Sequence, residues 1–376
     1  MSNLSEERIL SDVAEIVAGT SPTGSTINEV GIGVPFFQGS AEFGFRNPTI
    51  ERFTTSPVKM ASPGDILLSV RAPVGRVNIA SHECAIGRGL MAVRTYSPSD
   101  QLYLSYLLES LGTAWEAHSN DGTMFANLSK SALASMPLYW PENRQEIGNT
   151  FHIIDQRIEN CQRILETTSS LISAYCHSAV MNSQTEKEIS LAKAATLVNG
   201  GAFTKNASGV GKIVIRIKEL NSGVSESTVY NDIVVPEAKT AFPGDVLFAW
   251  SGSLGIYRWF KDEAIVNQHI FKVLPGAHPV WLCWFHISQA LEDFQDIAAG
   301  KATTMGHITK DHLERRKVID LGENEISLLA ENVEPLWEYQ LQIGREIEKL
   351  LEMRNFILPK LISGEIQILG NGQVKK

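Results

Sequence analysis

The sequence predicts an α+β fold built as an internal repeat, in which two β-rich units are each followed by one long helix. Three observations predict it: a stretch that recurs 180 residues later, short apolar runs separated by Pro/Gly turns, and a heptad pattern after each unit. With 376 residues, of which 43% are hydrophobic and 20% charged, the chain is long enough to form two domains with cores of their own.

The repeat is clearest where residues 59–94 align with residues 239–274 without a gap, because nine of these thirty-six positions are identical. The same offset places residues 127–133 (NLSKSAL) on residues 307–313 (HITKDHL). It also aligns two apolar stripes with helical spacing, formed by Leu102, Leu107 and Leu111 and by Leu282, Ile287 and Leu291. The duplication therefore extends over most of the chain.

Within each unit, alternating apolar runs predict strands, and Pro/Gly clusters predict the turns between them. Strands are expected at residues 33–37, 66–70, 77–80 and 212–217. The residues shared by the two copies are mostly turn formers and apolar residues, which favours a role in the scaffold. The predicted structural turn residues are Pro63, Gly64, Asp65, Gly75, Pro243, Gly244, Asp245 and Gly255.

A different pattern follows each unit, because apolar residues step by four and three from 147 to 179 and again from 329 to 357. The pattern predicts two helices of about 35 residues, each about 50 Å long, that pack on each other. Pro335 lies inside the second pattern, where proline removes a backbone hydrogen bond. We therefore expect a short helix to end before Pro335 and the long helix to begin near it.

Charge is distributed unevenly along the chain, whose formal net charge is -9. Residues 41–94 carry seven Arg/Lys and four acidic residues, whereas residues 321–365 carry nine acidic residues and four basic ones. The acidic balance thus belongs to the predicted helices. Basic clusters on the β-rich units suit contact with DNA phosphates, and ordinary solvated surface charge is an equally open interpretation. The acidic helix faces are either solvated or docking surfaces.

Taken together, these pieces resemble the specificity subunit of type I restriction-modification systems. Each unit has a PGDIL or PGDVL turn, then AIGRGLMAVR or IVNQHIFKV, then NLSK or HITK, and then a long helix. The resemblance covers nearly the whole chain and implies two target recognition domains separated by two antiparallel, coiled-coil-like helices with an approximate internal twofold. The implied segments are domain 1 (1–142), helix 1 (143–185), domain 2 (186–322), helix 2 (323–368) and a C-terminal tail (369–376).

The resemblance also implies a function. In this family each recognition domain reads one half of a split site in double-stranded DNA, and the helices fix the gap between the halves. Two methyltransferase subunits dock on the specificity subunit, and restriction subunits, which are motor nucleases, join them. The partners use S-adenosylmethionine, ATP and Mg²⁺, so this chain is expected to be non-catalytic and to bind no cofactor.

Motifs in the sequence agree with a non-catalytic chain. It contains neither the N-P-P-Y or D-P-P-Y tetrapeptide of adenine methyltransferases nor a G-x-x-x-x-G-K-[ST] phosphate loop. Cys84, Cys161, Cys176 and Cys283 show no metal-ligand spacing, and the longest apolar run, residues 280–287, is too short for a membrane span. We expect a cytoplasmic protein with reduced thiols and no membrane partner.

Positions that differ between the copies are the candidates for reading bases, because two copies with different targets should differ where they touch DNA. Arg, Asn and Gln are side chains that recognise guanine or adenine edges, whereas a lysine shared by both copies suits a phosphate. Sequence drift remains an alternative for any single position. The candidate DNA-binding residues, for bases or phosphates, are Arg71, Arg76, Asn78, Arg88, Lys130, Ser251, Arg258, Gln268, His269, Lys301 and Lys310.

Two other functions remain open from the sequence. The first is a duplicated protein-interaction scaffold that reads no DNA. The second is a metal-dependent nuclease that uses Asp232, Glu237 and Lys239, an acid followed by E-x-K. The first copy has Pro57-Val58-Lys59 at the matching place, so only the lysine is shared and the nuclease is disfavoured.

Overall fold

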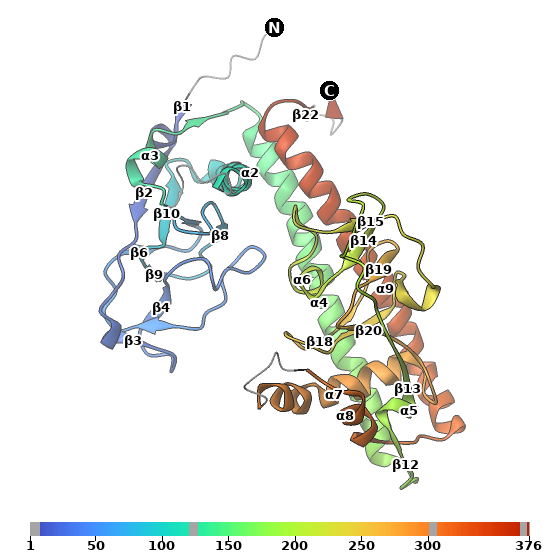
Figure 1. Cartoon of the computed structure of the whole chain (residues 1–376). Helices are drawn as coiled ribbons and strands as arrows, with labels where there is room; N and C mark the ends of the chain where they lie inside the picture. The colour runs from blue at the N-terminus through green and yellow to red at the C-terminus, as the bar shows by residue number, and fades with distance from the viewer. Residues whose placement is uncertain (1–7, 120–126, 301–306, 369–373, 376) are drawn as a thin grey trace. The chain divides into compact units, whose positions relative to one another are not determined.

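The computed structural model describes residues 8–119, 127–300, 307–368 and 374–375, and contacts within the chain separate two units (Figure 1). Unit 1 contains Met1–Ile158 and Leu350–Lys376, and unit 2 contains Glu159–Lys349. The boundary cuts both long helices, so each unit holds one β-rich part and a portion of each helix. No helix in the described part of the chain is both long and apolar enough to cross a membrane.

Unit 1 contains two main sheets. The first is antiparallel, with the order β2 (Ala14–Ala18), β10 (Leu90–Thr95), β7 (Ile66–Ser69) and β8 (Val77–Ile79). The second has the order β3 (Ile27–Asn28), β5 (Phe53–Thr54), β4 (Val34–Phe37), β9 (Cys84–Ile86) and β6 (Met60–Ala61), and its β4–β9 pair is parallel. Two small pairs are β1 (Arg8–Ile9) with β11 (Pro137–Leu138) and β22 (Gln367–Ile368) with β23 (Val374–Lys375). Besides the long helices, this unit has the helices α1 (Leu10–Val13), η1 (Gly24–Thr26), η2 (Pro98–Asp100), α2 (Gln101–Ser119) and α3 (Lys130–Ala134).

Unit 2 repeats this plan, with the same strand order in its first sheet and one strand fewer in its second. Its first sheet runs β13 (Ala195–Asn199), β20 (Ile270–Pro275), β17 (Val246–Ala249) and β18 (Gly255–Arg258). Its second runs β15 (Tyr230–Asn231), β14 (Lys212–Ile215), β19 (Ala264–Val266) and β16 (Thr240–Ala241), again with a parallel pair, β14–β19. The small pair is β12 (Glu188–Ser190) with β21 (Lys317–Ile319). Its helices are α5 (Leu191–Ala194), α6 (Ile217–Ser222), η3 (Glu237–Lys239), α7 (Val280–Ala299) and α8 (Lys310–Arg315).

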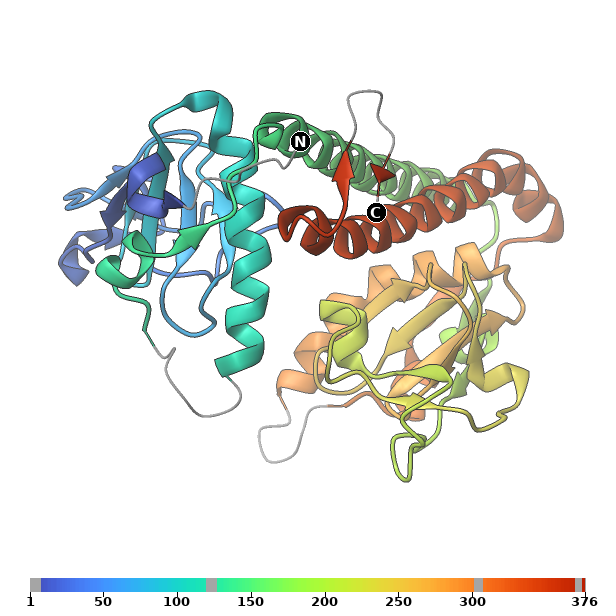
Figure 2. The ribbon, with the colours of Figure 1, turned by 90° about the horizontal axis from the view of Figure 1, so that it is seen from above.

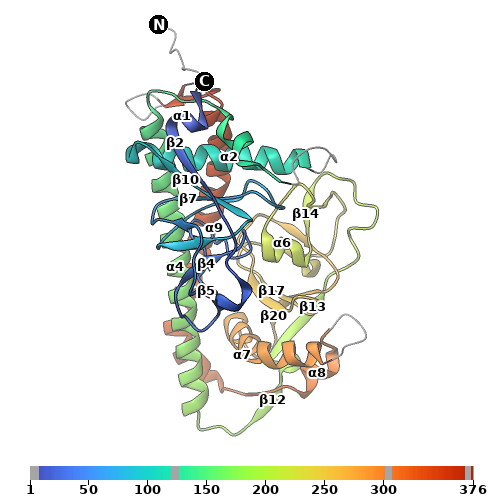
Figure 3. The same cartoon turned by 90° about the vertical axis from the view of Figure 1, so that its left-hand side faces the viewer.

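Each unit has a main core between its first sheet and its helices. In unit 1, Leu68 of β7 and Tyr106 of α2 belong to one apolar cluster with Phe151 and Leu361 of the long helices. Figure 2 shows α2 beside the sheet, and Figure 3 shows β2, β10 and β7 side by side. In unit 2, Phe248 and Phe294 pack in the corresponding cluster. Burying a large apolar side chain contributes about 1.5–3 kcal/mol, so these clusters attach the helices to each sheet.

The two long helices are α4 (Arg144–Asn182) and α9 (Glu323–Ile362), drawn green and red in Figure 1. In unit 1, Asp155 of α4 contacts Arg354 of α9. In unit 2, Gln340 of α9 donates to Thr168 of α4 at 3.0 Å, and Ser183, just after α4, contacts Glu325. Later positions on α4 thus meet earlier positions on α9, so the helices run antiparallel in both units. The predicted α+β fold with two β-rich domains and paired long helices is confirmed.

Two expectations about the helices were wrong. Helix α9 continues through Pro335, although we expected a break there. Pro335 has no N–H to donate to the carbonyl of Glu331. Both residues are exposed, so water can hydrate that carbonyl. The neighbouring Val333 and Trp337 are buried and keep the helix in place. The second expectation concerns α4, where the heptad pattern places Tyr175 between the two helices. Tyr175 is instead 38% exposed, and the adjacent Cys176 is buried because the helix contacts the unit 2 core at that point.

The Pro-Gly-Asp sequences form matching turns in both copies. Gly64 and Gly244 have φ values of 89° and 97°, which favour glycine, and each donates its N–H across the turn, to Ala80 and Trp259 respectively. Asp65 Oδ2 accepts from the Ser62 N–H at 2.7 Å, and Asp245 makes the equivalent bond.

The second pair of glycines differs between the copies. Gly75 has a φ of 91° and lies against the backbone of Gly112 on α2, so it belongs to a turn with a close approach. Gly255 is instead the first residue of β18 and pairs with Ala249. The prediction that Gly255 forms a turn was therefore wrong. A side chain there would meet the Tyr257 ring, which explains why a glycine fits.

Candidate nucleic-acid interface

In unit 1, backbone hydrogen bonds bring three separate segments together where β7 ends. Val70 donates its N–H to Gly89 in the β9–β10 loop at 2.9 Å, and Leu128 donates to Val70 at 3.0 Å. Arg71 and Asn127 pair directly as an isolated bridge. We call this surface edge 1; its exposed polar residues are Arg71, Arg76, Arg88, Asn127 and Lys130.

Arg88 stands at the tip of a tight loop. Gly87 and Gly89 flank it, and a Cβ on either residue would collide with Gln38, so glycine is required by the close approach. The backbone of the loop is held by Gly87 N–H to Phe37 and Gly89 N–H to Gln38. The guanidinium of Arg88 is exposed beside the Ser21 hydroxyl, with Nε 3.4 Å from Oγ. A hydrogen-bonded backbone thus presents an exposed cationic side chain.

In unit 2, the corresponding segments meet through the same backbone bonds. Trp250 donates its N–H to His269 at 3.1 Å, Ile308 donates to Trp250 at 2.9 Å, and Ser251 pairs with His307. We call this surface edge 2; it comprises Trp250, Ser251, Gln268, His269, His307 and Lys310.

The side chains of edge 2 form an aromatic group in place of arginines. The Trp250 ring lies 5.1 Å from the His269 ring and 6.2 Å from the His307 ring, and its Nε1 donates to Asn199 Oδ1 at 2.9 Å. His269 has a φ of 72°, unusual for a residue with a side chain, and its Nδ1 is buried without a hydrogen-bond partner within the described residues. Gln268 is exposed next to it.

The two edges therefore share a backbone and differ in chemistry. Edge 1 exposes guanidinium groups, which bind phosphates and guanine edges, whereas edge 2 exposes an amide beside imidazole and indole rings. A common scaffold with different side chains at the same places is the arrangement expected of two copies that bind different sequences.

Of the predicted contact residues, Asn78 and Ser251 are buried, and Arg258 is half-buried and held by contacts within unit 2. Asn78 is 2% exposed, and its amide donates to the carbonyls of Gly44 and Val77 while Oδ1 accepts from the Gly44 N–H, so no group is left for a base. Ser251 is 6% exposed. These predictions were wrong because polar residues that differ between copies can also stabilise copy-specific packing.

Arg258 is the third of these residues. Its guanidinium lies 3.8 Å from the ring centroid of Trp337, and its NH1 donates to Trp337 O at 2.6 Å and to Gln340 Oε1 at 3.1 Å. Burial lowers the pKa of Arg258 to about 10. The group therefore attaches β18 to α9 within unit 2.

The remaining candidates are placed as follows. Arg71, Arg76, Arg88, Lys130, Gln268 and Lys310 are exposed, His269 is half-buried, and Lys301 lies outside the described residues. Lys130 and Lys310 are the first residues of α3 and α8, matching positions in the two units. Sequence comparison missed Ser21, Gln38 and Asn199 as contributors, because their place at the edges depends on contacts between distant segments.

The nuclease candidates do not assemble a site. Asp232 and Glu237 are exposed, and the Lys239 ammonium lies 6.0 Å from the Phe203 ring centroid. Among the described residues there is no group of three or more His, Cys, Asp or Glu side chains that could hold a metal ion. All four cysteines are buried and unbridged.

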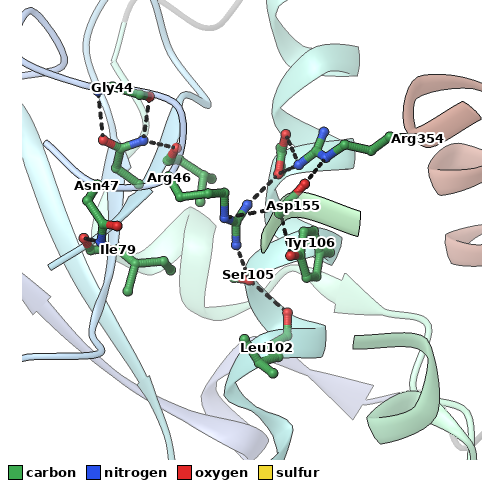
Figure 4. Close-up of polar contacts among 12 residues, drawn as sticks. Gly44, Arg46, Asn47, Ile79, Leu102, Ser105, Tyr106, Asp155 and Arg354 are labelled. Carbon is green, nitrogen blue, oxygen red and sulfur yellow. Dashed lines mark hydrogen bonds and ion pairs between the residues drawn. The ribbon is translucent and has the colours of Figure 1, made fainter. Parts of the chain in front are cut away.

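A buried ionic cluster in unit 1 was also missed by the sequence comparison (Figure 4). Arg354 of α9 donates to Asp155 of α4 at 2.6 Å and to both oxygens of Glu109 of α2 at 2.8 Å. Arg46, from the β4–β5 connection, reaches Glu109 at 3.0 Å and Asp155 at 3.3 Å. Tyr106 donates to Asp155 at 2.7 Å.

The carboxylates of this cluster favour the charged form of Arg354. Burial alone would lower the pKa of Arg354, but Glu109 and Asp155 raise it above its usual range. Burial raises the pKa of Tyr106, so its hydroxyl remains a donor to Asp155. Two arginines and two carboxylates balance in formal charge, which is the condition under which buried charges are tolerated.

Comparisons with known proteins agree with this architecture. Residues 3–168 match the model of the type I restriction modification DNA specificity domain. The segment formed by residues 3–168 therefore resembles this family's specificity domain. A type I restriction enzyme specificity subunit of Methanocaldococcus jannaschii, MjaX, is 38% identical over 148 residues, which are 39% of this chain and 35% of that protein, so the chain spans about a third of this relative.

Two further matches cover nearly the whole chain. The MjaIX specificity subunit of the same organism is 24% identical over 409 aligned positions, covering 96% of this chain and 93% of that protein. The crystal structure of the S subunit of a type I restriction-modification system from M. genitalium has a TM-score of 0.58 at 16% identity over 96% of this chain and 97% of that one. This structure shows that the fold is shared along the length of the chain.

Proposed function

We propose that this chain is the DNA sequence-specificity subunit of a type I restriction-modification complex, in which each β-rich domain reads one half of a bipartite, asymmetric site. The observation that carries the proposal is the duplicated edge, whose backbone is the same in both units while its exposed side chains differ. Unlike side chains on like scaffolds predict unlike half-sites.

The partners follow from the same proposal. Double-stranded DNA binds the two edges, two methyltransferase subunits dock on the chain, and restriction subunits join that complex in the cytoplasm. S-adenosylmethionine, ATP and Mg²⁺ belong to those partners, so this chain binds no cofactor and catalyses nothing itself. The antiparallel pair α4–α9 sets the number of base pairs between the half-sites.

Methylation-sensitive sequencing of the host genome, with and without the gene, tests the function. We expect a bipartite motif with methylated adenine that disappears on deletion. Replacing residues 186–322 with the second domain of another family member should change only one half of that motif. A change in both halves would overturn the division into two independent readers.

The alternatives give different results in the same system. A protein scaffold that reads no DNA would leave the methylation pattern intact, and its complex with the methyltransferase would show no sequence-selective, salt-dependent binding. A nuclease using Asp232, Glu237 and Lys239 would cleave DNA with Mg²⁺ as the purified chain alone. We expect neither result.

A further inference from the structure

We infer that Asp155 and Arg354 are positioning residues for spacer selectivity: the buried ionic cluster of unit 1 fixes the orientation of the first domain on the helix pair (Figure 4). The inference rests on the proposed function, because spacer selectivity has meaning only if the chain reads a bipartite site. It adds a specific residue set to that function.

The cluster joins four elements at one point. Arg46 and Glu109 belong to the first β-rich domain, whereas Asp155 lies on α4 and Arg354 on α9. The side chains of Asp155, Arg354 and Arg46 are 2%, 6% and 10% exposed, so water screens the contacts among these three little. The Glu109 side chain is 28% exposed, so its contacts are screened more. Every ion pair between Arg354 and Glu109, or between Arg46 and Asp155, connects the domain to the helices.

Directionality distinguishes this cluster from the apolar contacts around it. Leu358, Leu361 and Phe151 pack against the domain through contacts that tolerate small rotations, since apolar burial depends on area and not on direction. A planar guanidinium whose separate nitrogens bind carboxylates on two different elements permits far less rotation. Arg354 donates from Nε to Asp155 at 2.6 Å and from Nη2 to both oxygens of Glu109 at 2.8 Å.

Orientation matters because DNA is helical. Lengthening a spacer by one base pair moves a half-site by about 3.4 Å and turns it by roughly 35° around the DNA axis. A domain held in one orientation accepts one spacer, whereas a domain free to rotate accepts its neighbours as well. Buried ion pairs often serve such specificity of arrangement more than net stability.

The test replaces the cluster by apolar groups without leaving a net charge. The variant is Arg354→Met, Asp155→Leu and Tyr106→Phe, which keeps the Arg46–Glu109 pair. Its matched control is Arg52→Met with Glu42→Leu, which removes a part-buried ion pair confined to the first domain. Both are assembled with the methyltransferase subunits and assayed on duplexes that carry the native half-sites with the native spacer or one base pair more or less.

We expect the preference of the variant complex for the native spacer to fall at least about tenfold, equivalent to about 1.4 kcal/mol, while discrimination among bases within each half-site stays as in the unaltered protein. The control should keep both selectivities. If the variant complex assembles and keeps its spacer preference, the inference is overturned. A variant that fails to assemble is replaced by Arg354→Lys, which keeps the charge and loses the planar group that binds Asp155 and Glu109 through separate nitrogens. Unchanged spacer preference in that variant would equally overturn the inference.

Failure of the proposed function looks different. In that case the unaltered complex itself would show no preference among spacers or half-sites.

Discussion

The first sheets of the two β-rich domains have the same strand order, but the domains are attached to the long helices by different chemistry. Unit 1 uses the ionic cluster centred on Asp155 and Arg354, whereas unit 2 places Arg258 on the Trp337 ring. At the 180-residue offset, Asp155 corresponds to Pro335 and Arg354 to Ala174, so the cluster has no counterpart in unit 2. The repeat thus preserved the sheets, while each helix–domain contact acquired its own side chains.

This difference explains why divergent polar residues mark two kinds of site. Arg88 and Gln268 differ because they are exposed at the edges, whereas Asn78 and Arg258 differ because each fits its own interior. A difference between the two copies marks exposed and interior polar residues alike. Only burial and hydrogen bonding distinguish the two kinds. The predictions below test the comparison between the units, from the largest expected effect to the smallest.

Removing one charge from the unit 1 cluster should have the largest effect on stability. Arg354→Ala leaves Asp155 and Glu109 with only Arg46 as a cationic partner, and we expect the free energy of unfolding to fall by about 3–5 kcal/mol. Urea unfolding, monitored by hydrogen exchange of the unit 1 amides, measures this change in the free energy of unfolding. The exposed Lys310→Ala serves as the control and should change stability by less than about 0.5 kcal/mol. Equal effects would show that the cluster contributes no more than surface charge.

The Arg258 contacts that attach β18 to α9 in unit 2 should contribute less to stability than the ionic cluster of unit 1. Arg258→Met removes charged hydrogen bonds to Trp337 O and Gln340 but keeps the apolar stem, so we expect a loss of about 2–3 kcal/mol. Arg345→Met, which breaks a surface ion pair on the same helix, is the matched control and should cost less than about 1 kcal/mol. If R258M cost more than R354A, our ranking of the two attachments would be reversed.

The two units should also respond differently to acid, because His286 stands where unit 1 has Tyr106. Burial, together with His278, lowers the pKa of His286 to about 3, so the folded state keeps it neutral while the unfolded chain protonates it below about pH 6.5. This stabilisation is present above pH 6.5 and is lost as the pH falls from there toward 3, by about 1.4 kcal/mol per pH unit.

Unfolding of the protein and of His286→Tyr between pH 7 and 5 tests this difference. The variant should lose less stability per pH unit than the unaltered protein, with His278, whose pKa is also lowered by burial, supplying the remaining slope. Identical slopes would mean that His286 does not titrate on unfolding.

The smallest effect is expected where the units agree. Lys130 and Lys310 begin equivalent helices and are exposed, so we predict phosphate contacts on both half-sites. Replacing either by Gln should reduce the slope of log affinity against log salt by about 1 for the complex with methyltransferase, without changing base preference. A change in the recognised bases would make the lysine a reader, contrary to this prediction.

The sequence by itself determined the repeat, the turns at Pro63 and Pro243, the main strands and the two long helices, because these depend on local periodicity and turn chemistry. Only the tertiary structure decided which polar side chains are buried. Arg46, Glu109, Asp155 and Arg354 come from four separate elements, and no local pattern predicts that they meet. Pro335 failed as a helix break for the same reason, since packing of its neighbours outweighs one lost hydrogen bond.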